Sequence, residues 1–107
     1  MRAPSVVRVW RGFLAPSSVS VYLEHFDREV RPTLQATAGF LGAGVLRRDG
    51  EQGVELVVST CWESLDSVRG FAGEDIHRAV VHPTARAALL GYDERVAHYE
   101  VIRTIDR

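Results

Sequence analysis

The first apolar segment of the chain places an arginine and a tryptophan where both could take part in chemistry. Arg8 and Trp10 are two residues apart in Ser5–Phe13, so in a strand both side chains point to the same face. A guanidinium is a forked donor that fits a carboxylate or a phenolate, and an indole ring stacks on flat aromatic compounds. Two interpretations of Arg8 are open, an anchor for a substrate anion or an ion pair with an acid on a helix. Trp10 is either a wall of a binding site or a core residue.

The histidines supply side chains that titrate near neutral pH. The chain has four, His25, His77, His82 and His98. None is three or four residues from another and Cys61 is the only cysteine, so the spacing predicts no metal site and no intrachain disulfide. His82 is the candidate general base. The alternative for His82 is a cap-like role before Pro83.

Aromatic side chains elsewhere are candidates for the rest of a substrate site. Helical spacing puts Tyr22 and Phe26 on one face of the first helix, and Phe71 and His77 belong to a later helical region that Gly73 and Pro83 interrupt. We expect a cleft between this interrupted region and the sheet, because apolar clefts with a few polar groups are the usual ligand sites. Trp62 ends a predicted strand and either lines the cleft or packs in the core. The predicted substrate-binding residues are Trp10, Tyr22, Phe26, Trp62, Phe71 and His77, with His82 and Arg8 as the catalytic pair.

The order of the predicted elements is β-α-β-β-α-β. Period-two and helical patterns predict strands at 5–13, 40–48, 54–62 and 96–105, a helix that starts at 15–18 and ends or kinks at Pro32, and helical pieces at 65–72, 75–80 and 84–90. Asp49–Gly50 predicts the turn of a hairpin. This order indicates an α+β fold of the ferredoxin-like type with an antiparallel sheet, and 107 residues fit one domain over 1–107.

Both faces of the predicted sheet carry large apolar side chains. Alternation places Val6, Arg8 and Trp10 on one side of the first strand and Val7, Val9 and Arg11 on the other. One layer of helices covers one face only, so we expect the second face to be buried in a homodimer. The alternative is a monomer whose loops or tails cover that face.

Composition narrows the class of partner. The formal net charge is −1, with 46% hydrophobic and 25% charged residues, which is typical of a globular protein that does not bind nucleic acid or a membrane. No apolar run approaches the roughly 20 residues of a membrane span, and Arg8 interrupts the only apolar stretch near the N-terminus, so we expect no signal peptide. With its single cysteine, the chain is expected to be cytoplasmic.

Short motifs in a fixed order resemble one known family, the antibiotic biosynthesis monooxygenase-like members of the dimeric α+β barrel superfamily. They are Arg8-Val9-Trp10-Arg11-Gly12, Thr37-Ala38-Gly39-Phe40, Trp62-Glu63-Ser64, Phe71-Ala72-Gly73-Glu74-Asp75-Ile76 and His98-Tyr99-Glu100-Val101. The resemblance spans about residues 5 to 103. It implies a dimeric α+β barrel, and activities that range from cofactor-independent oxygenation to haem degradation and polyketide cyclisation.

The residues distinguish among these activities only in part. In the haem-degrading relatives a helical tryptophan precedes the iron-ligating histidine, and the matching positions here are Phe71 and Val81, one residue before His82. The first strand lacks the asparagine of those enzymes, and Val58 stands where the anthrone oxygenases have another. The resemblance favours a cofactor-independent monooxygenase acting on a flat aromatic, quinol or polyketide-like small molecule, with no cofactor and no metal. The alternatives are a cyclase or isomerase on the same scaffold, and a non-catalytic small-molecule binding protein, including one that binds haem.

Overall fold

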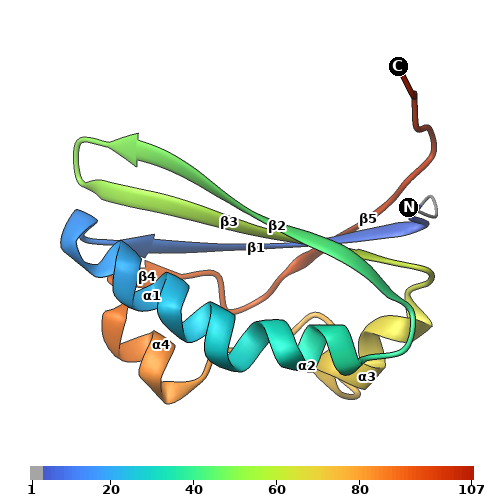
Figure 1. Cartoon of the computed structure of the whole chain (residues 1–107), viewed down its shortest axis with the longest axis horizontal. Coiled ribbons are helices and arrows are strands. Elements are labelled where there is room, and N and C mark those ends of the chain that lie inside the picture. Colours follow the sequence, from blue (N-terminus) through green and yellow to red (C-terminus); the bar gives the residue numbers. More distant parts are fainter. Residues whose placement is uncertain (1–3) are drawn as a thin grey trace.

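A computed structural model describes residues 4–107 and shows one sheet with helices packed on one of its faces (Figure 1). The elements in chain order are β1 (Val6–Leu14), η1 (Pro16–Ser18), α1 (Val19–His25), η2 (Phe26–Val30), α2 (Arg31–Ala36), β2 (Phe40–Gly50), β3 (Gly53–Trp62), η3 (Asp66–Val68), α3 (Arg69–Ala72), α4 (Pro83–Ala88), β4 (Gly91–Tyr92) and β5 (Ala97–Glu100). The predicted α+β fold with an antiparallel sheet is therefore confirmed.

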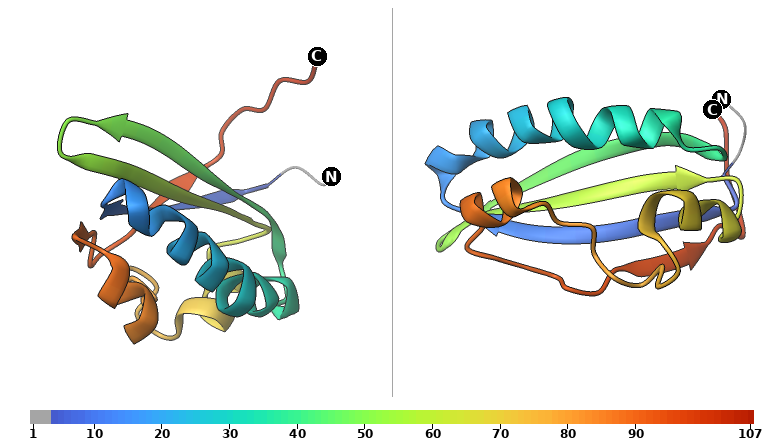
Figure 2. Two further views of the ribbon diagram at one scale, coloured as in Figure 1. Left: turned by 60° about the vertical axis from the view of Figure 1, so that its left-hand side comes forward. Right: turned by 90° about the horizontal axis from the view of Figure 1, so that it is seen from below.

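Strand β1 lies in the centre of the sheet. Its one edge pairs with β3, which in turn pairs with β2, and its other edge pairs with β4 and β5 one after the other. All these pairings are antiparallel. The helices all lie on the same side of this sheet (Figure 2).

The alternation predicted for β1 decides which side chains reach the helices. Its burial alternates along the strand, with Val6, Arg8, Trp10 and Leu14 buried beneath the helices. In β3 the same face carries Val54, Leu56 and Trp62, which are almost fully buried. Burial of such side chains contributes about 1.5–3 kcal/mol each, so this face holds the core.

The first helix does not end at Pro32. It widens into a π-helical turn over η2, where the N–H of Arg31 donates to the carbonyl of Phe26, and then continues to Ala36. Pro32 falls in the first turn of α2, where a missing N–H costs least. The helix therefore does not end at Pro32, which was one of the two predicted outcomes.

The hairpin turn lies two residues beyond the predicted one. Gly50 pairs with Gly53, and the turn itself is formed by Glu51 and Gln52. Asp49 stays in the ladder opposite Val54 and forms an ion pair with Arg47 at 2.7 Å. Gly53, with φ of +139°, supplies the conformation that lets the chain turn back.

The region between Gly73 and Pro83 differs most from the prediction. Gly73, with φ of +84°, ends α3 as expected, but the predicted helical piece at 75–80 is limited to one turn, in which the Arg78 N–H donates to Asp75 O at 3.2 Å. Instead Arg78 forms a β-bridge with Arg95, the Ala79 N–H donates to Glu94 O at 2.9 Å, and the Val96 N–H donates to His77 O at 2.7 Å. These bonds to a distant segment replace the local bonds of a helix.

The predicted fourth strand is shorter in the structure than in the prediction. Residues 94–96 bond to residues 77–79, and the strand predicted at 96–105 is observed only as β5 (Ala97–Glu100). The short β4 (Gly91–Tyr92) comes before it and was not predicted. The predicted last helix, 84–90, is observed as α4 over Pro83–Ala88.

The second face of the sheet has no helix over it. Val7, Val9, Val57 and Cys61 are half-buried there, and the register places Leu46 beside Val57 and Tyr99 beside Val7 on the same face. Leu46 and Tyr99 are 58% and 59% exposed, so an apolar surface remains open. The helices of residues 4–107 are all too short or too polar to cross a bilayer.

Candidate active site

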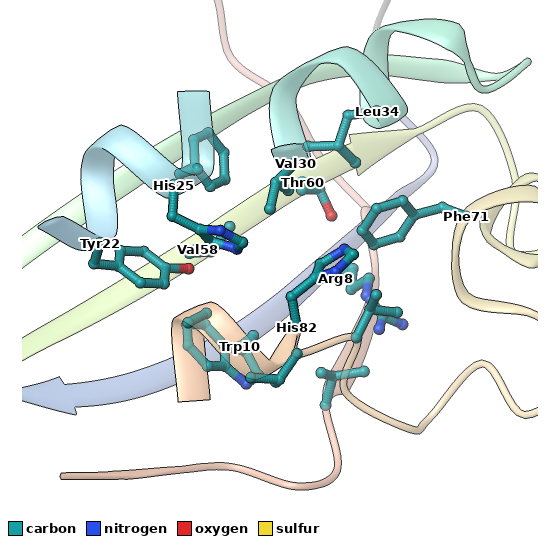
Figure 3. Close-up of a pocket in the computed structure, with 15 residues that line it drawn as sticks. Arg8, Trp10, Tyr22, His25, Val30, Leu34, Val58, Thr60, Phe71 and His82 are labelled. Carbon is teal, nitrogen blue, oxygen red and sulfur yellow. The ribbon is translucent and has the colours of Figure 1, made fainter. Parts of the chain in front are cut away.

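A small cavity lies between the sheet, the first helix and the segment before α4 (Figure 3). Its volume is about 50 Å³. Its wall is mostly apolar and includes Arg8, Trp10, Tyr22, His25, Phe26, Val30, Leu34, Val58, Thr60, Phe71, Val80, Val81, His82, Ala85 and Val96. Six of the eight predicted site residues are in this wall, and no aspartate or glutamate is among its lining residues.

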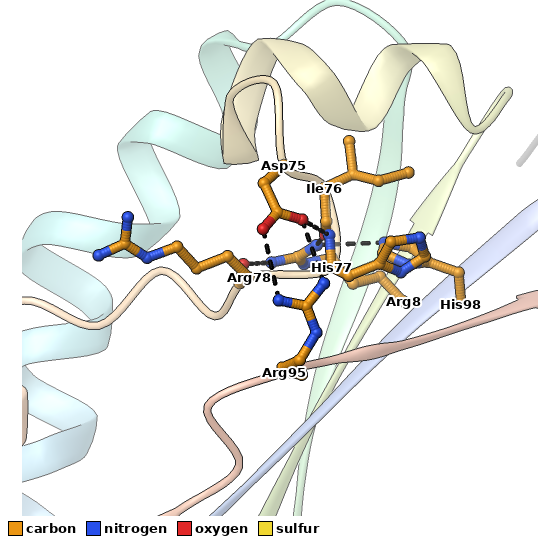
Figure 4. A network of polar contacts seen from close by, with 7 residues as sticks. All are labelled: Arg8, Asp75, Ile76, His77, Arg78, Arg95 and His98. Carbon is orange, nitrogen blue, oxygen red and sulfur yellow. Dashed lines mark hydrogen bonds and ion pairs between the residues drawn. The ribbon is translucent and has the colours of Figure 1, made fainter.

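Arg8 is buried beside the cavity and is held by neutral groups. Its guanidinium donates to the main-chain carbonyls of Ile76 and, at 3.0 Å, of Arg78, and Nη1 lies 3.1 Å from His98 Nε2 (Figure 4). The guanidinium carbon also lies 5.8 Å from the centre of the Phe71 ring. Burial lowers the pKa of Arg8 to about 10, so the side chain still carries its charge at neutral pH.

The predicted alternative for Arg8, an ion pair with an acid on a helix, is not found among residues 4–107. The nearest acid in the polar network, Asp75, receives hydrogen bonds from Arg95 instead. The buried charge of Arg8 therefore has no carboxylate partner within the described chain.

His98 supports Arg8 from β5. Burial, followed by the positive charges of Arg8 and His77, lowers the pKa of His98 to about 4. The imidazole is therefore neutral at neutral pH, and its Nε2 accepts from Arg8. The other ring nitrogen, Nδ1, is buried without a hydrogen-bond partner in the described chain.

Trp10 and Tyr22 form an aromatic wall. Their rings are stacked with centroids 6.0 Å apart, and the indole N–H donates to the Asp93 carbonyl at 3.0 Å. Gly12 makes room for this indole, because a Cβ at that position would lie 2.5 Å from its Cη2 atom. Burial raises the pKa of Tyr22 to about 12, so its hydroxyl stays protonated.

His82 and His25 face each other across the cavity mouth. Their ring centroids are 5.6 Å apart at an interplanar angle of 65°. His25 is buried on α1, and His82 precedes Pro83 at the start of α4 without a side-chain capping bond. The Tyr22 hydroxyl and the His25 ring point into the same space (Figure 3).

Two predicted residues lie outside the cavity wall. Trp62 is fully buried, its indole N–H donates to Thr60 Oγ1 at 2.9 Å, and its ring packs on Phe40 and Phe71. It is a core residue and supports the wall through Phe71. His77 is exposed and packs edge-on against His98 at 5.2 Å between centroids, because the bridge between Arg78 and Arg95 holds its segment on the outer side.

His25 is the functional candidate that the sequence analysis missed. It lies three residues after Tyr22 and next to Phe26, so helical spacing places all three near one face. That spacing was the available signal. Val80 and Val81 were also missed as lining residues. The segment was predicted to be helical up to residue 80, whereas the chain there is extended and reaches the cavity.

The comparison with family models assigns the chain. The model of the antibiotic biosynthesis monooxygenase domain matches residues 6–83, which include most of the cavity wall. The chain belongs to the antibiotic biosynthesis monooxygenase family. No curated protein matches it.

Solved structures similar to this family member share its fold. The monooxygenase of the gene ActVA-Orf6 from Streptomyces coelicolor, in complex with nanaomycin D, has a TM-score of 0.71 at 19% identity, covering 97% of this chain and 93% of the other. SnoaB, a cofactor-independent oxygenase from Streptomyces nogalater, gives 0.61 at 20% identity, covering 98% and 100%. MhuD, a heme degrader from Mycobacterium tuberculosis with two hemes bound, gives 0.57 at 22% identity, covering 94% and 99%.

Haem does not fit the cavity of this family member. Haem iron is commonly held by histidine, and His25 and His82 are both present, but the cavity as it stands, about 50 Å³, is smaller than the cavity of about 150 Å³ that takes a single benzene ring, and a porphyrin is several times larger still. Among residues 4–107, no three His, Cys, Asp or Glu side chains come together as metal ligands. We therefore derive no step through haem or a metal.

Proposed function

We propose that this family member is a cofactor-independent monooxygenase acting on a phenol or quinol that binds as its anion. The observation that carries the proposal is the charge of the cavity. Arg8 brings a buried positive charge to a wall that includes no acid. A bound phenolate would compensate this charge, because charge-assisted hydrogen bonds are stronger than neutral ones.

The rest of the wall supports an aromatic ligand. Trp10, Tyr22 and Phe71 offer ring faces, and Val58 and Ala85 offer apolar contacts. The cavity must widen to admit even one ring, since an apolar cavity that takes benzene measures about 150 Å³. The segment 73–82 can supply this space, because it has no helix and Val80 and Val81 make no main-chain hydrogen bonds beyond it in the described chain.

The proposed reaction begins with removal of the phenol proton by a histidine of the wall, where the sequence pointed to His82. The O–H bond breaks and its electron pair stays on the oxygen, which Arg8 stabilises. The phenolate is electron-rich at the ring carbon opposite its oxygen, and molecular oxygen adds at that C–H carbon to form a C–O bond. The outer peroxide oxygen takes up a proton, and loss of water from the hydroperoxide, with the hydrogen of that carbon, leaves a carbonyl. One oxygen atom becomes a carbonyl oxygen and the other leaves as water, so the substrate supplies the electrons and no cofactor is needed.

Oxygen uptake tests this proposal directly. Phenol, 1-naphthol and anthrone form a series of one, two and three rings, and the enol form of anthrone has the phenol O–H that the reaction needs. We expect oxygen uptake above the uncatalysed rate with anthrone and conversion to the quinone by mass spectrometry. Arg8→Met should abolish the increase. Conversion of a polyketide-like substrate without oxygen would instead indicate a cyclase or isomerase, and quenching of tryptophan fluorescence without turnover would indicate a binding protein.

We also propose that the protein is a homodimer whose open sheet faces meet. Val9 and Val57 lie at the centre of the uncovered face and Leu46 and Tyr99 project from it. The C-terminal tail adds to this surface, because after the bond from Val101 N–H to Ser5 O its isoleucines at 102 and 105 are 81% and 88% exposed. Patches of this kind are typical of protein interfaces.

A further inference from the structure

Two histidines lie between the cavity and the surface of the molecule. A depression on the surface between α1 and α4 is lined by Val21, Glu24, His25, Arg28, Glu29, His82, Pro83 and Thr84. His25 and His82 are the two lining residues that this depression shares with the cavity. The pair therefore lies where the cavity adjoins the surface depression.

The two imidazoles are placed for proton movement. Their centroids are 5.6 Å apart, edge to face, a separation that one bridging water can span. Among the described residues, the ring nitrogens of His25 and His82 form no hydrogen bond with another side chain. His25 is buried and His82 is exposed, which gives the pair an inner and an outer member.

We propose that His25 and His82 form the proton route of the cavity, with His25 accepting the proton of a bound phenol and His82 passing it to solvent. This inference rests on the proposed phenolate-binding function and adds His25 as a catalytic residue. The phenol O–H bond breaks, an N–H bond forms on His25, and the proton then moves to His82 and to water. No electron leaves or joins the system in these steps.

The charges around His25 suit an acceptor. Burial lowers the pKa of His25, the positive charges of His82 and Arg28 lower it further, and Glu29 acts in the opposite direction. From the other elements, Arg8 on β1 faces the same cavity with its positive charge, and the Tyr22 hydroxyl is neutral. His25 is therefore neutral before the ligand binds, and a phenolate beside it would stabilise its protonated form.

The probe for the test is 4-nitrophenol, whose ionised form is yellow. At about pH 6.5, where an imidazole whose pKa lies below its ordinary value is more than half neutral, the protein is titrated with 4-nitrophenol while absorbance and the ring nitrogen shifts of the four histidines are recorded by NMR. We expect the phenolate absorbance to appear together with the imidazolium shifts of His25. His25→Gln should reduce the phenolate fraction about tenfold, with circular dichroism as the check on folding.

The outer member is tested by His82→Gln, an exposed substitution that keeps a polar side chain. We expect the titration midpoint of His25 to rise, because a neighbouring positive charge is removed, and the exchange of its ring proton with water to slow severalfold. The matched control is His77→Gln, which lies outside the cavity and should change neither quantity.

The outcomes separate the two proposals. A phenolate signal without protonation of His25 would overturn the proton route and leave the anion-binding cavity intact. Proton exchange at His25 that is unchanged in His82→Gln would overturn the role of His82. No binding of 4-nitrophenol at all would overturn the proposed function together with this inference.

Discussion

Nη1 of Arg8 lies 3.1 Å from Nε2 of His98, and this contact fixes the state of the histidine. An arginine only donates, so Nε2 must accept and the ring hydrogen must be on Nδ1. Protonation of His98 would put a second positive charge against the first. Several properties of the protein follow from this pair.

The first prediction concerns acid stability. Because the pKa of His98 is about 4 in the folded protein and about 6.5 in the unfolded chain, the unfolded state binds more protons between these values. The free energy of unfolding should therefore fall as the pH is lowered from about 6.5 to 4, by about 1–2 kcal/mol after allowance for solvent screening. Urea unfolding at a series of pH values measures this, and His98→Gln should flatten that part of the curve. An equal slope in His98→Gln would contradict the assignment.

The second prediction concerns the charge of Arg8. Arg8→Met should weaken the binding of benzoate at least tenfold, since a charge-assisted hydrogen bond contributes about 1.5–3 kcal/mol. Benzyl alcohol is the matched neutral probe, and its binding should change less than about twofold by the same reasoning. Calorimetry measures both. The substitution also leaves the Ile76 and Arg78 carbonyls without their donor, so we expect a stability loss of about 1–3 kcal/mol. Equal effects on the two probes would show that Arg8 does not select for charge.

The third prediction concerns Gly12. A Cβ there would lie 2.5 Å from Trp10 Cη2 and 3.0 Å from Leu89 Cδ2, so Gly12→Ala should push the indole toward the cavity. We expect a stability loss of about 1–3 kcal/mol and weaker 4-nitrophenol binding. Gly91→Ala is the control, because a Cβ at Gly91 meets nothing within 4 Å. Both are read by urea unfolding and tryptophan fluorescence.

The fourth prediction concerns the homodimer. Val9→Asp puts a charge at the middle of the open sheet face and should dissociate or unfold the dimer, because a buried unpaired charge is costly. Val21→Asp makes the same change on an exposed helix position and should leave the dimer intact. Light scattering at micromolar concentration measures the mass. A monomeric wild-type protein would contradict the proposal.

The alternating pattern of β1 and β3 made most of the fold predictable. Which side chains of these strands face the helices depends only on period two, so the buried positions of Arg8 and Trp10 followed from the sequence. The segment 75–80 was not predictable in this way, because its hydrogen bonds go to residues 94–96 and to the guanidinium of Arg8. The pattern of residues within a segment does not indicate hydrogen bonds to residues that are distant in the sequence.

Most lining residues of the candidate site could be predicted from the sequence, but the volume of the cavity could not. Six of the eight predicted residues share one wall, because strand and helix periodicity fixed their directions. The size of the cavity depends on how Val80 and Val81 approach it, which no periodicity determines. His25 was missed because its position beside His82 depends on how α1 packs against α4, which the helical spacing of α1 does not determine.

The support of Arg8 has a consequence for how this protein can change over evolution. Its two acceptors in the segment after α3 are main-chain oxygens, which every amino acid possesses. Side chains at 76 and 78 can therefore drift while the guanidinium keeps its place. Insertions or deletions between Gly73 and Pro83 would move those oxygens, so the length of this segment should be held more strictly than its residue types.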